Sequence, residues 1–341
     1  MLKGKQTWTF ANKPIILGTG VTGGPFEANG DIPGDFDILY SDLWMEQDSY
    51  EKAHRHLLEK AMEIALEKGK IKKEDVQFLL AGDLINQLTP TSLAARSNGI
   101  PYFGLFGACS TSMEGLALAA FITNYGGADY ILTGASSHNA AVEKQFRYPT
   151  EYGGQKPPTA QWTITGAGVA LVTPSGTRQE AYPHIVSATI GKVIDMGLKD
   201  PFNMGGAMAP AAVDTILSHL EDTGLTPDDY DLIVTGDLGK IGRSTALDLL
   251  AAKGCRINQE KFKDCGLIVF KEDQPVLAGG SGAGCSAVVL YGHLLNEMSQ
   301  GKYKRILMVA TGALLSPLTV QQKETIPCIA HAVAIEYGTN A

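Results

Sequence analysis

An internal repeat is the feature that most constrains how this chain can fold. Residues 74–84 align without a gap with residues 228–238, and each segment runs from acidic residues through an apolar stretch to Gly-Asp-Leu. A short apolar stretch with acidic residues before it and a glycine after it predicts a buried strand followed by a turn. Two such copies, separated by almost half of the chain, indicate that the protein contains two related halves.

The same order of predicted elements surrounds each copy. An opening strand (14–17 and 184–191) is followed by an amphipathic helix (50–68 and 209–220) and by the Gly-Asp-Leu strand. A second helix, a further strand, a helix of small residues and two closing strands complete each half. Strands that alternate with helices favour mainly parallel sheets that are covered on both faces. We therefore predict an α/β protein of two duplicated βαβαβαββ halves, whose apolar helices pack against each other.

The boundary between the halves is predicted at the polar stretch 174–180. This places the N-terminal half at residues 1–174 and the C-terminal half at residues 175–341. The segment 137–165 has no regular pattern and is predicted to be a loop inserted in the first half. Loops of this length are usually functional or disordered.

Composition excludes several classes of protein. The formal net charge is −8 with acidic and basic residues interspersed, so no basic stripe is available for nucleic acid. The five cysteines include no Cys-x-x-Cys pair, which argues against a disulfide framework or a zinc site and favours a reducing compartment. The most apolar stretch is interrupted by Glu114, Asn124 and Asp129. Neither a signal peptide nor a transmembrane segment is therefore expected.

Cys109 is the first candidate for a functional residue. It lies between the apolar run 101–106 and a predicted helix of small residues that continues to residue 121. Unpaired backbone N–H groups at a helix N-terminus favour an anion, so a cysteine there can have its pKa lowered from about 8.5 to roughly 4 to 7. A free cysteine is more commonly a buried structural residue. Position alone leaves both interpretations open.

Three segments carry a resemblance to a known family. They are 107–115 (GACSTSMEG), 205–210 (GGAMAP) and 326–336 (IPCIAHAVAIE). Over nearly its whole length the chain resembles the thiolase superfamily, which comprises thiolases and ketoacyl synthases. More closely, the three segments resemble the stage V sporulation protein AD family of spore-forming bacilli. This resemblance implies a five-layered αβαβα fold, a homodimer, and binding of dipicolinic acid during its uptake into the developing spore.

The catalytic residues of the superfamily are missing from the matching motifs. Active members support the nucleophilic cysteine with a His and with a second His or an Asn, which stabilise the oxyanion and transfer protons. Here the first motif reads 235–239 (TGDLG), Gly280 stands at the second, and Thr311 replaces the second thiolase cysteine. Each lost oxyanion donor typically costs roughly 10²–10³-fold in rate. We therefore predict a protein that is not an enzyme and that carries neither a cofactor nor a metal.

Dipicolinate is a flat pyridine ring with two carboxylates, so its site should combine N–H groups or cations with an apolar wall. Glycine in place of imidazole would leave room for the ring. The predicted ligand-binding residues are Cys109, Ser110, His138, Asp237, Lys240, Arg243, Gly280 and His331. Ordinary surface charge explains Lys240 and Arg243 equally well. His331 lies in an apolar strand, where a histidine is more often part of the core.

The inserted segment offers a second set of cations and aromatic rings. These residues are Lys144, Arg147, Tyr148, Tyr152 and Lys156. A dimer-contact loop would have the same composition. Two other functions also stay open: an acyltransferase that uses Cys109 with His138 or His331 as its base, and a structural subunit whose pocket is a relic.

The family resemblance also implies partners and a location. The partners are dipicolinic acid, with calcium as a candidate companion, and other products of the stage V sporulation protein A operon at the membrane. The expected location is inside the sporulating cell, on the spore inner membrane. Because neither a spanning segment nor a basic amphipathic helix is visible, attachment there would depend on the partner proteins.

Overall fold

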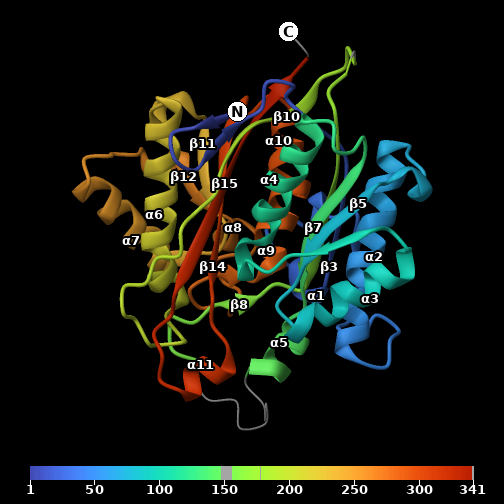
Figure 1. The fold of residues 1–341 in the computed structure, drawn as a ribbon. Helices are drawn as coiled ribbons and strands as arrows, with labels where there is room; N and C mark the ends of the chain where they lie inside the picture. The colour runs from blue at the N-terminus through green and yellow to red at the C-terminus, as the bar shows by residue number, and fades with distance from the viewer. Residues whose placement is uncertain (147–155, 177, 340–341) are drawn as a thin grey trace.

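The computed structural model describes residues 1–146, 156–176 and 178–339. Its helices and half-sheets stack in five layers, seen side by side in Figure 1. The outer layers are α2 (Tyr50–Gly69) with α3 (Thr89–Asn98) on one side and α6 (Met204–Thr223) with α7 (Gly239–Ala252) on the other. Helices α4 (Thr111–Asn124) and α9 (Ala283–Val288) lie between the half-sheets. The αβαβα arrangement predicted from the family resemblance is confirmed.

The two half-sheets have the same strand order and the same directions. In the N-terminal half the order is β6 (Tyr102–Gly104), β5 (Phe78–Gly82), β7 (Ile131–Ser137), β9 (Gly166–Thr173) and β3 (Ile15–Gly23). In the C-terminal half it is β12 (Phe262–Asp264), β11 (Leu232–Thr235), β14 (Arg305–Ala313), β15 (Cys328–Gly338) and β10 (Tyr182–Thr189). Strands β9 and β15 run antiparallel to both of their neighbours. The half-sheets join where His184 pairs with Ile15.

This repeated topology matches the duplication predicted from the sequence. The division into domains at residues 174 and 175 stays a prediction. The strand with Gly82-Asp83-Leu84 and the strand with Gly236-Asp237-Leu238 take equivalent positions, each next to the edge of its half-sheet. Both turns therefore lie at the carboxyl ends of parallel strands, which is where open α/β sheets usually bind ligands.

The central helices are apolar on every side because both half-sheets contact them. Small residues let the layers approach closely. A Cβ atom at Gly115 of α4 would lie 2.4 Å from Thr133 Oγ1 of β7, so only glycine fits there. By contrast, α2 is amphipathic and exposes one face. It begins where the Ser49 side chain accepts a hydrogen bond from Lys52 N at 3.2 Å.

The segment 137–165 is more regular than predicted. It contains the end of β7, α5 (Asn139–Phe146) and β8 (Trp162–Thr163), and residues 147–155 lie outside the described part of the chain. Strand β8 pairs with β13 (Gly280–Ser281), so the inserted segment reaches into the other half. This pairing joins distant segments, so the local pattern did not predict it.

Short elements connect the layers. They are β1 (Leu2–Lys3), β2 (Thr7–Thr9), α1 (Pro25–Ala28), β4 (Ile38–Leu39), the turn η4 (Ala108–Ser110), α8 (Cys265–Ile268), the π-helical turn η8 (Val289–Leu294), α10 (Leu295–Ser299) and α11 (Pro317–Gln321). In the part of the chain that is described, every helix is too short or too polar to cross a membrane.

Candidate functional site

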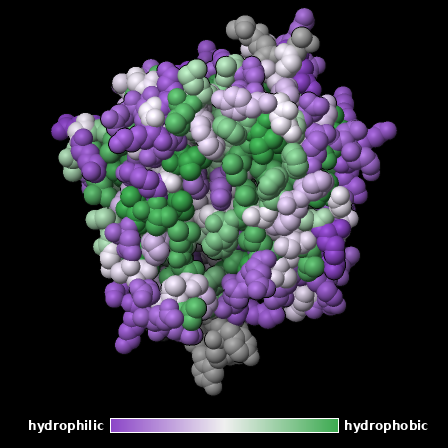
Figure 2. All heavy atoms as spheres, viewed as in Figure 1, coloured by the Kyte–Doolittle hydropathy of each residue, from purple (hydrophilic) through white to green (hydrophobic). Residues whose placement is uncertain are grey.

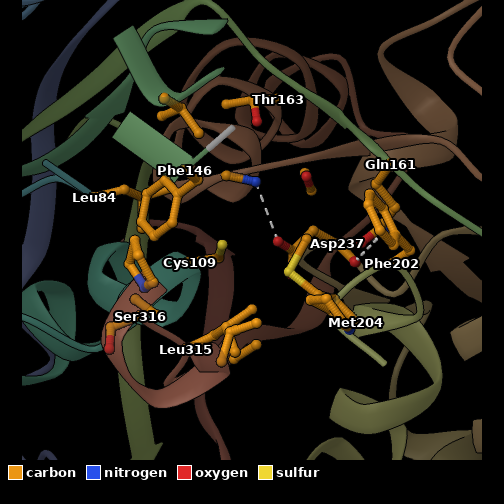
Figure 3. A pocket seen from close by; sticks show the side chains of 18 of the residues that line it. Leu84, Cys109, Phe146, Gln161, Thr163, Phe202, Met204, Asp237, Leu315 and Ser316 are labelled. Carbon is orange, nitrogen blue, oxygen red and sulfur yellow. Dashed lines mark hydrogen bonds between the residues drawn. The ribbon is translucent and has the colours of Figure 1, made fainter. Parts of the chain in front are cut away.

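A cavity of about 400 Å³ opens where the Gly-Asp-Leu turns of the two halves meet (Figure 3). On the molecular surface, apolar side chains surround a recess in the face seen in Figure 2. The apolar walls are Leu84, Phe106, Val142, Phe146, Pro201, Phe202, Met204, Met208, Ala313, Leu315, Pro317 and Val320. The polar side chains are Cys109, Glu143, Gln161, Thr163, Asp237, Ser281, Ser316 and Gln321. An apolar cavity with a few convergent polar groups is typical of a small-molecule site.

A strained turn directs Cys109 into the cavity. Ala108 has a φ of 50°, a left-handed conformation that residues with a side chain seldom adopt. The Thr111 hydroxyl holds this turn, because it donates to the Ala108 carbonyl (2.7 Å) and accepts from Gly107 N (3.0 Å). The surrounding bonds thus maintain a conformation that the backbone alone would disfavour.

Asp237 lies beside Cys109 and is buried. One carboxylate oxygen accepts from Thr311 Oγ1 (2.7 Å), and the other accepts from Gly282 N (3.2 Å). The Cys109 thiol lies close enough to the same carboxyl group for each to influence the pKa of the other. Burial raises the pKa of Asp237 to about 7, although the hydrogen bonds from Thr311 and Cys109 oppose this increase.

Of the two interpretations left open for Cys109, the structure supports the protonated thiol and not the thiol with a lowered pKa. Burial raises the pKa of the thiol well above its usual value, and the negative charge of Asp237 raises it further. The backbone N–H groups at the start of α4 are outweighed, because desolvation and a neighbouring carboxylate both disfavour a thiolate. The thiol is therefore protonated at neutral pH.

Three other predicted ligand-binding residues make their hydrogen bonds away from the cavity. Ser110 Oγ donates to a carbonyl in its own turn at 2.6 Å. His138 Nε2 pairs with the Leu43 carbonyl at 2.9 Å, and His331 Nδ1 accepts from Gly191 N at 3.2 Å. Burial lowers the pKa of each histidine to about 4. Neither imidazole lines the cavity, so the alternative in which one of them serves as the base for Cys109 loses its support.

The predicted cations also lie elsewhere. Arg243 donates from Nε to the Phe262 carbonyl (2.8 Å) and from Nη2 to the Gln259 carbonyl (2.7 Å). Lys240 is exposed on α7. Neither residue lines the cavity, because α7 turns both side chains away from it. The structure therefore places neither cation at this cavity, and their part in ligand binding stays a prediction.

Gly280 does not provide room for a ligand ring. A Cβ atom there would lie 3.0 Å from the ring of Phe270, and Gly280 does not line the cavity. A Cβ atom at Gly236 would meet the backbone of Ala310 at 3.0 Å. Neighbouring atoms have taken the space that a larger side chain would need. The cavity owes its size to its apolar walls and not to these glycines.

The cations of the inserted segment are paired where the structure describes them. Lys144 Nζ lies 2.8 Å from Glu51 Oε1, and Lys156 Nζ lies 2.9 Å from Glu143 Oε1. Arg147, Tyr148 and Tyr152 lie outside the described residues. Of the eight predicted residues, the structure thus places only Cys109 and Asp237 at the cavity.

Most of the wall was not predicted from the sequence. It comes from α5, the loop before α6, and the connection between β14 and β15. Leu84 could have been found, because it occupies the last position of the first Gly-Asp-Leu copy. Gln161 has no such signal. Its side chain is positioned by a hydrogen bond from Nε2 to the main-chain carbonyl of Asp237 (2.6 Å), a contact between distant segments.

Comparison with known proteins identifies the family. The family model described as stage V sporulation protein AD matches residues 4–336. The chain belongs to this family. The stage V sporulation protein AD of Bacillus subtilis (strain 168) is 49% identical over 342 residues, covering 100% of this chain and 99% of that relative. The chain is thus a member of a family of sporulation proteins.

Solved structures of enzymes share the fold of this family member. The 3-oxoacyl-[acyl-carrier-protein] synthase III of Aquifex aeolicus VF5 has a TM-score of 0.60 and 15% identity, covering 95% of this chain and 100% of that chain. A variant of OleA from Xanthomonas campestris has a TM-score of 0.61 and 15% identity, covering 97% and 100%. These similarities show a thiolase-like fold. Within the described ranges, no group of three or more His, Cys, Asp or Glu residues is placed to hold a metal ion.

Proposed function

We propose that this chain is a thiolase-fold protein that binds dipicolinic acid in the cavity over Cys109, supports its uptake into the developing spore, and does not catalyse acyl transfer. The cavity itself is the observation that carries this proposal. Its volume of about 400 Å³ is within the ordinary range for small-molecule sites. The side chains of Phe106, Phe146 and Phe202 give flat apolar surfaces that suit a pyridine ring. Dipicolinic acid is the ligand that the family resemblance implies.

The polar groups around Cys109 support a binding role over a catalytic one. A thiol with a raised pKa is a poor nucleophile. The buried carboxyl group of Asp237 would oppose the negative charge of an oxyanion in the same space. No histidine is found among the described residues that line the cavity. A pocket inherited from an enzyme fold could therefore persist as a binding site.

We also propose a homodimer that acts at the spore inner membrane through other products of the stage V sporulation protein A operon. Strand β6 is the last strand of its half-sheet, so its outer edge is available for a second copy. Phe103 and Phe106, in and just after this strand, are 50% and 53% exposed. Light scattering during size-exclusion chromatography should give twice the chain mass, and Phe103→Glu should yield a monomer. A monomeric wild-type protein would exclude the homodimer.

Calorimetric titration tests the binding function. Dipicolinate should bind, whereas pyridine-2,4-dicarboxylate, which has the same atoms in another arrangement, should bind far more weakly. Titrations with and without calcium decide whether the metal enters with the ligand. Incubation with acetyl and malonyl thioesters should release no thiol above background. Release that disappears in Cys109→Ala would establish the acyltransferase alternative instead.

A further inference from the structure

The polar side of the cavity is rich in hydrogen-bond acceptors. Asp237 already receives hydrogen bonds from Thr311 and Gly282 on its two carboxylate oxygens, and the Cys109 thiol lies beside them. Gln161 is 2% exposed, and its Nε2 donates to the main-chain carbonyl of Asp237. Its Oε1 is left as a buried acceptor. That oxygen has no hydrogen-bond partner among the described residues. An unpaired buried acceptor costs free energy, so a ligand that brings a proton suits this site.

The side chains that line the cavity offer no compensating positive charge. None of the described lining residues is Lys, Arg or His. The other acidic lining residue, Glu143, pairs with Lys156.

The ionisable groups that face Asp237 from neighbouring elements are also acids. Asp264 in β12 interacts unfavourably with it, and four thiols also lie close enough to interact with it. These thiols belong to Cys109 (η4), Cys265 (α8), Cys285 (α9) and Cys328 (β15). A dicarboxylate that entered as a dianion would therefore meet the Asp237 carboxylate with no cation among the described lining side chains to separate them.

We propose that dipicolinate binds together with one proton, which is held between the Asp237 carboxyl group and a carboxylate of the ligand. This inference rests on the proposed function and adds that pH regulates the affinity for the ligand. Two carboxylates in contact cannot both stay ionised, and sharing one proton converts their repulsion into a hydrogen bond. Gln161, which donates to the main-chain carbonyl of Asp237 and lines the same cavity, adds a buried acceptor without a partner and so favours a ligand that carries a proton.

The proton makes the affinity depend on pH in a defined direction. Burial already raises the pKa of Asp237 to about 7 in the free protein. Well below that pH the carboxyl group already carries the proton, and the affinity should change little. Above it, binding must restore the proton, so the dissociation constant should rise about tenfold for each pH unit.

Titration of the full chain with dipicolinate from about pH 5.5 to about pH 8.5 tests this proposal. Each pH should be measured in phosphate and in Tris, because their different ionisation enthalpies report the protons taken up. We expect uptake of about one proton per ligand near pH 8 and little uptake near pH 6. In Asp237→Asn the amide N–H group replaces the carboxyl proton, so the affinity should become independent of pH. Asp83→Asn, which changes the matching turn of the other half, should keep the wild-type pH dependence.

Two results would overturn the inference. Binding that is independent of pH and takes up no proton would overturn it and leave the proposed function intact. If that affinity were also lost in Arg147→Ala, a cation outside the described residues would hold the carboxylate. Absence of binding at every pH would overturn the proposed function together with this inference. Should Asp237→Asn fail to fold, the comparison of buffers on the wild-type protein decides alone.

Discussion

The two Gly-Asp-Leu turns have the same sequence and equivalent places in their half-sheets, yet their aspartates have different surroundings. Asp83 Oδ1 accepts from Ile85 N (2.7 Å), and Oδ2 accepts from Thr91 N (3.0 Å) and from the Thr91 hydroxyl. Asp83 thus stabilises the start of α3 within its own half. Asp237 accepts from Thr311 and Gly282, lies beside the Cys109 thiol of the opposite half, and lines the cavity. The two turns therefore share one sequence and one place in the repeated topology, and the elements packed around each turn give its aspartate a different role.

A second aspartate, Asp264, explains why the side chain of Asp237 is not needed to cap helix α7. In the C-terminal half, helix α7 begins directly after the turn, and Asp264 of β12 accepts from Leu238 N (2.8 Å) and Gly239 N (3.0 Å) there. The first N–H groups of the helix are therefore satisfied without Asp237. In the N-terminal half, Asp83 itself serves α3. The comparison teaches that a buried carboxyl group can turn toward a cavity when another residue caps the adjacent helix.

The largest expected effect lies on the cavity side of this comparison. Cys109→Trp should reduce the affinity for dipicolinate by more than about 100-fold, because the indole would fill the space over the cavity floor. Cys109→Ser should change the affinity little, since the thiol does not react. Calorimetry measures both, with Ile241→Trp on the exposed face of α7 as a control of equal bulk. If Cys109→Trp folds and binds at wild-type affinity, the ligand site is elsewhere.

The turn in the N-terminal half should show the opposite behaviour. Asp83→Ala leaves two backbone N–H groups and a hydroxyl without their acceptor, so the free energy of unfolding should fall by about 3 kcal/mol. The affinity for dipicolinate should stay the same, because Asp83 does not line the cavity. Urea unfolding and calorimetry separate the two quantities. Loss of affinity without loss of stability would contradict the different roles assigned to the two turns.

The free energy of unfolding should depend on pH through the buried carboxyl group of Asp237. The pKa of Asp237 is about 7 in the folded protein against a usual value of 3.8, so the folded state holds this proton more tightly. Its contribution to stability is therefore present below about pH 4 and is lost as the pH rises to about 7. Relative to wild type, Asp237→Asn should gain roughly 3 kcal/mol over this range. Urea unfolding across the range checks this. A constant difference would show that Asp237 is ionised throughout.

The smallest effects concern the cations that the sequence had placed at the ligand site. Arg243→Ala should lower the free energy of unfolding by about 1 kcal/mol, because two carbonyl groups lose a partly exposed donor. It should leave the affinity for dipicolinate unchanged. Lys240→Ala should change neither quantity, and therefore serves as the matched control. If either variant bound dipicolinate more weakly, the replaced cation would contribute to ligand binding after all.

The fold was more predictable than the site. Repeated hydrophobic patterns predicted both Gly-Asp-Leu strands, and the predicted helix 50–68 closely matches α2. The helix predicted at 209–220 begins earlier, at Met204, because the Asn203 side chain accepts from Gly206 N at 3.3 Å. At the site, Cys109 and Asp237 were expected from motifs. The contacts of Arg243 with Phe262 and Gln259, away from the cavity, could not be predicted, because they depend on how α7 packs.

The amino-acid sequence by itself determined the order of strands and helices, their duplication, the turn that carries Cys109, and the family. Periodicity, turn residues and motifs are local properties that can be read along the chain. Only the tertiary structure decided that Cys109 keeps its proton, that Asp237 faces the cavity, and that no described lining residue is a cation. Burial and electrostatic neighbours set these properties, and they come from segments that are far apart in the sequence and meet only in the folded protein.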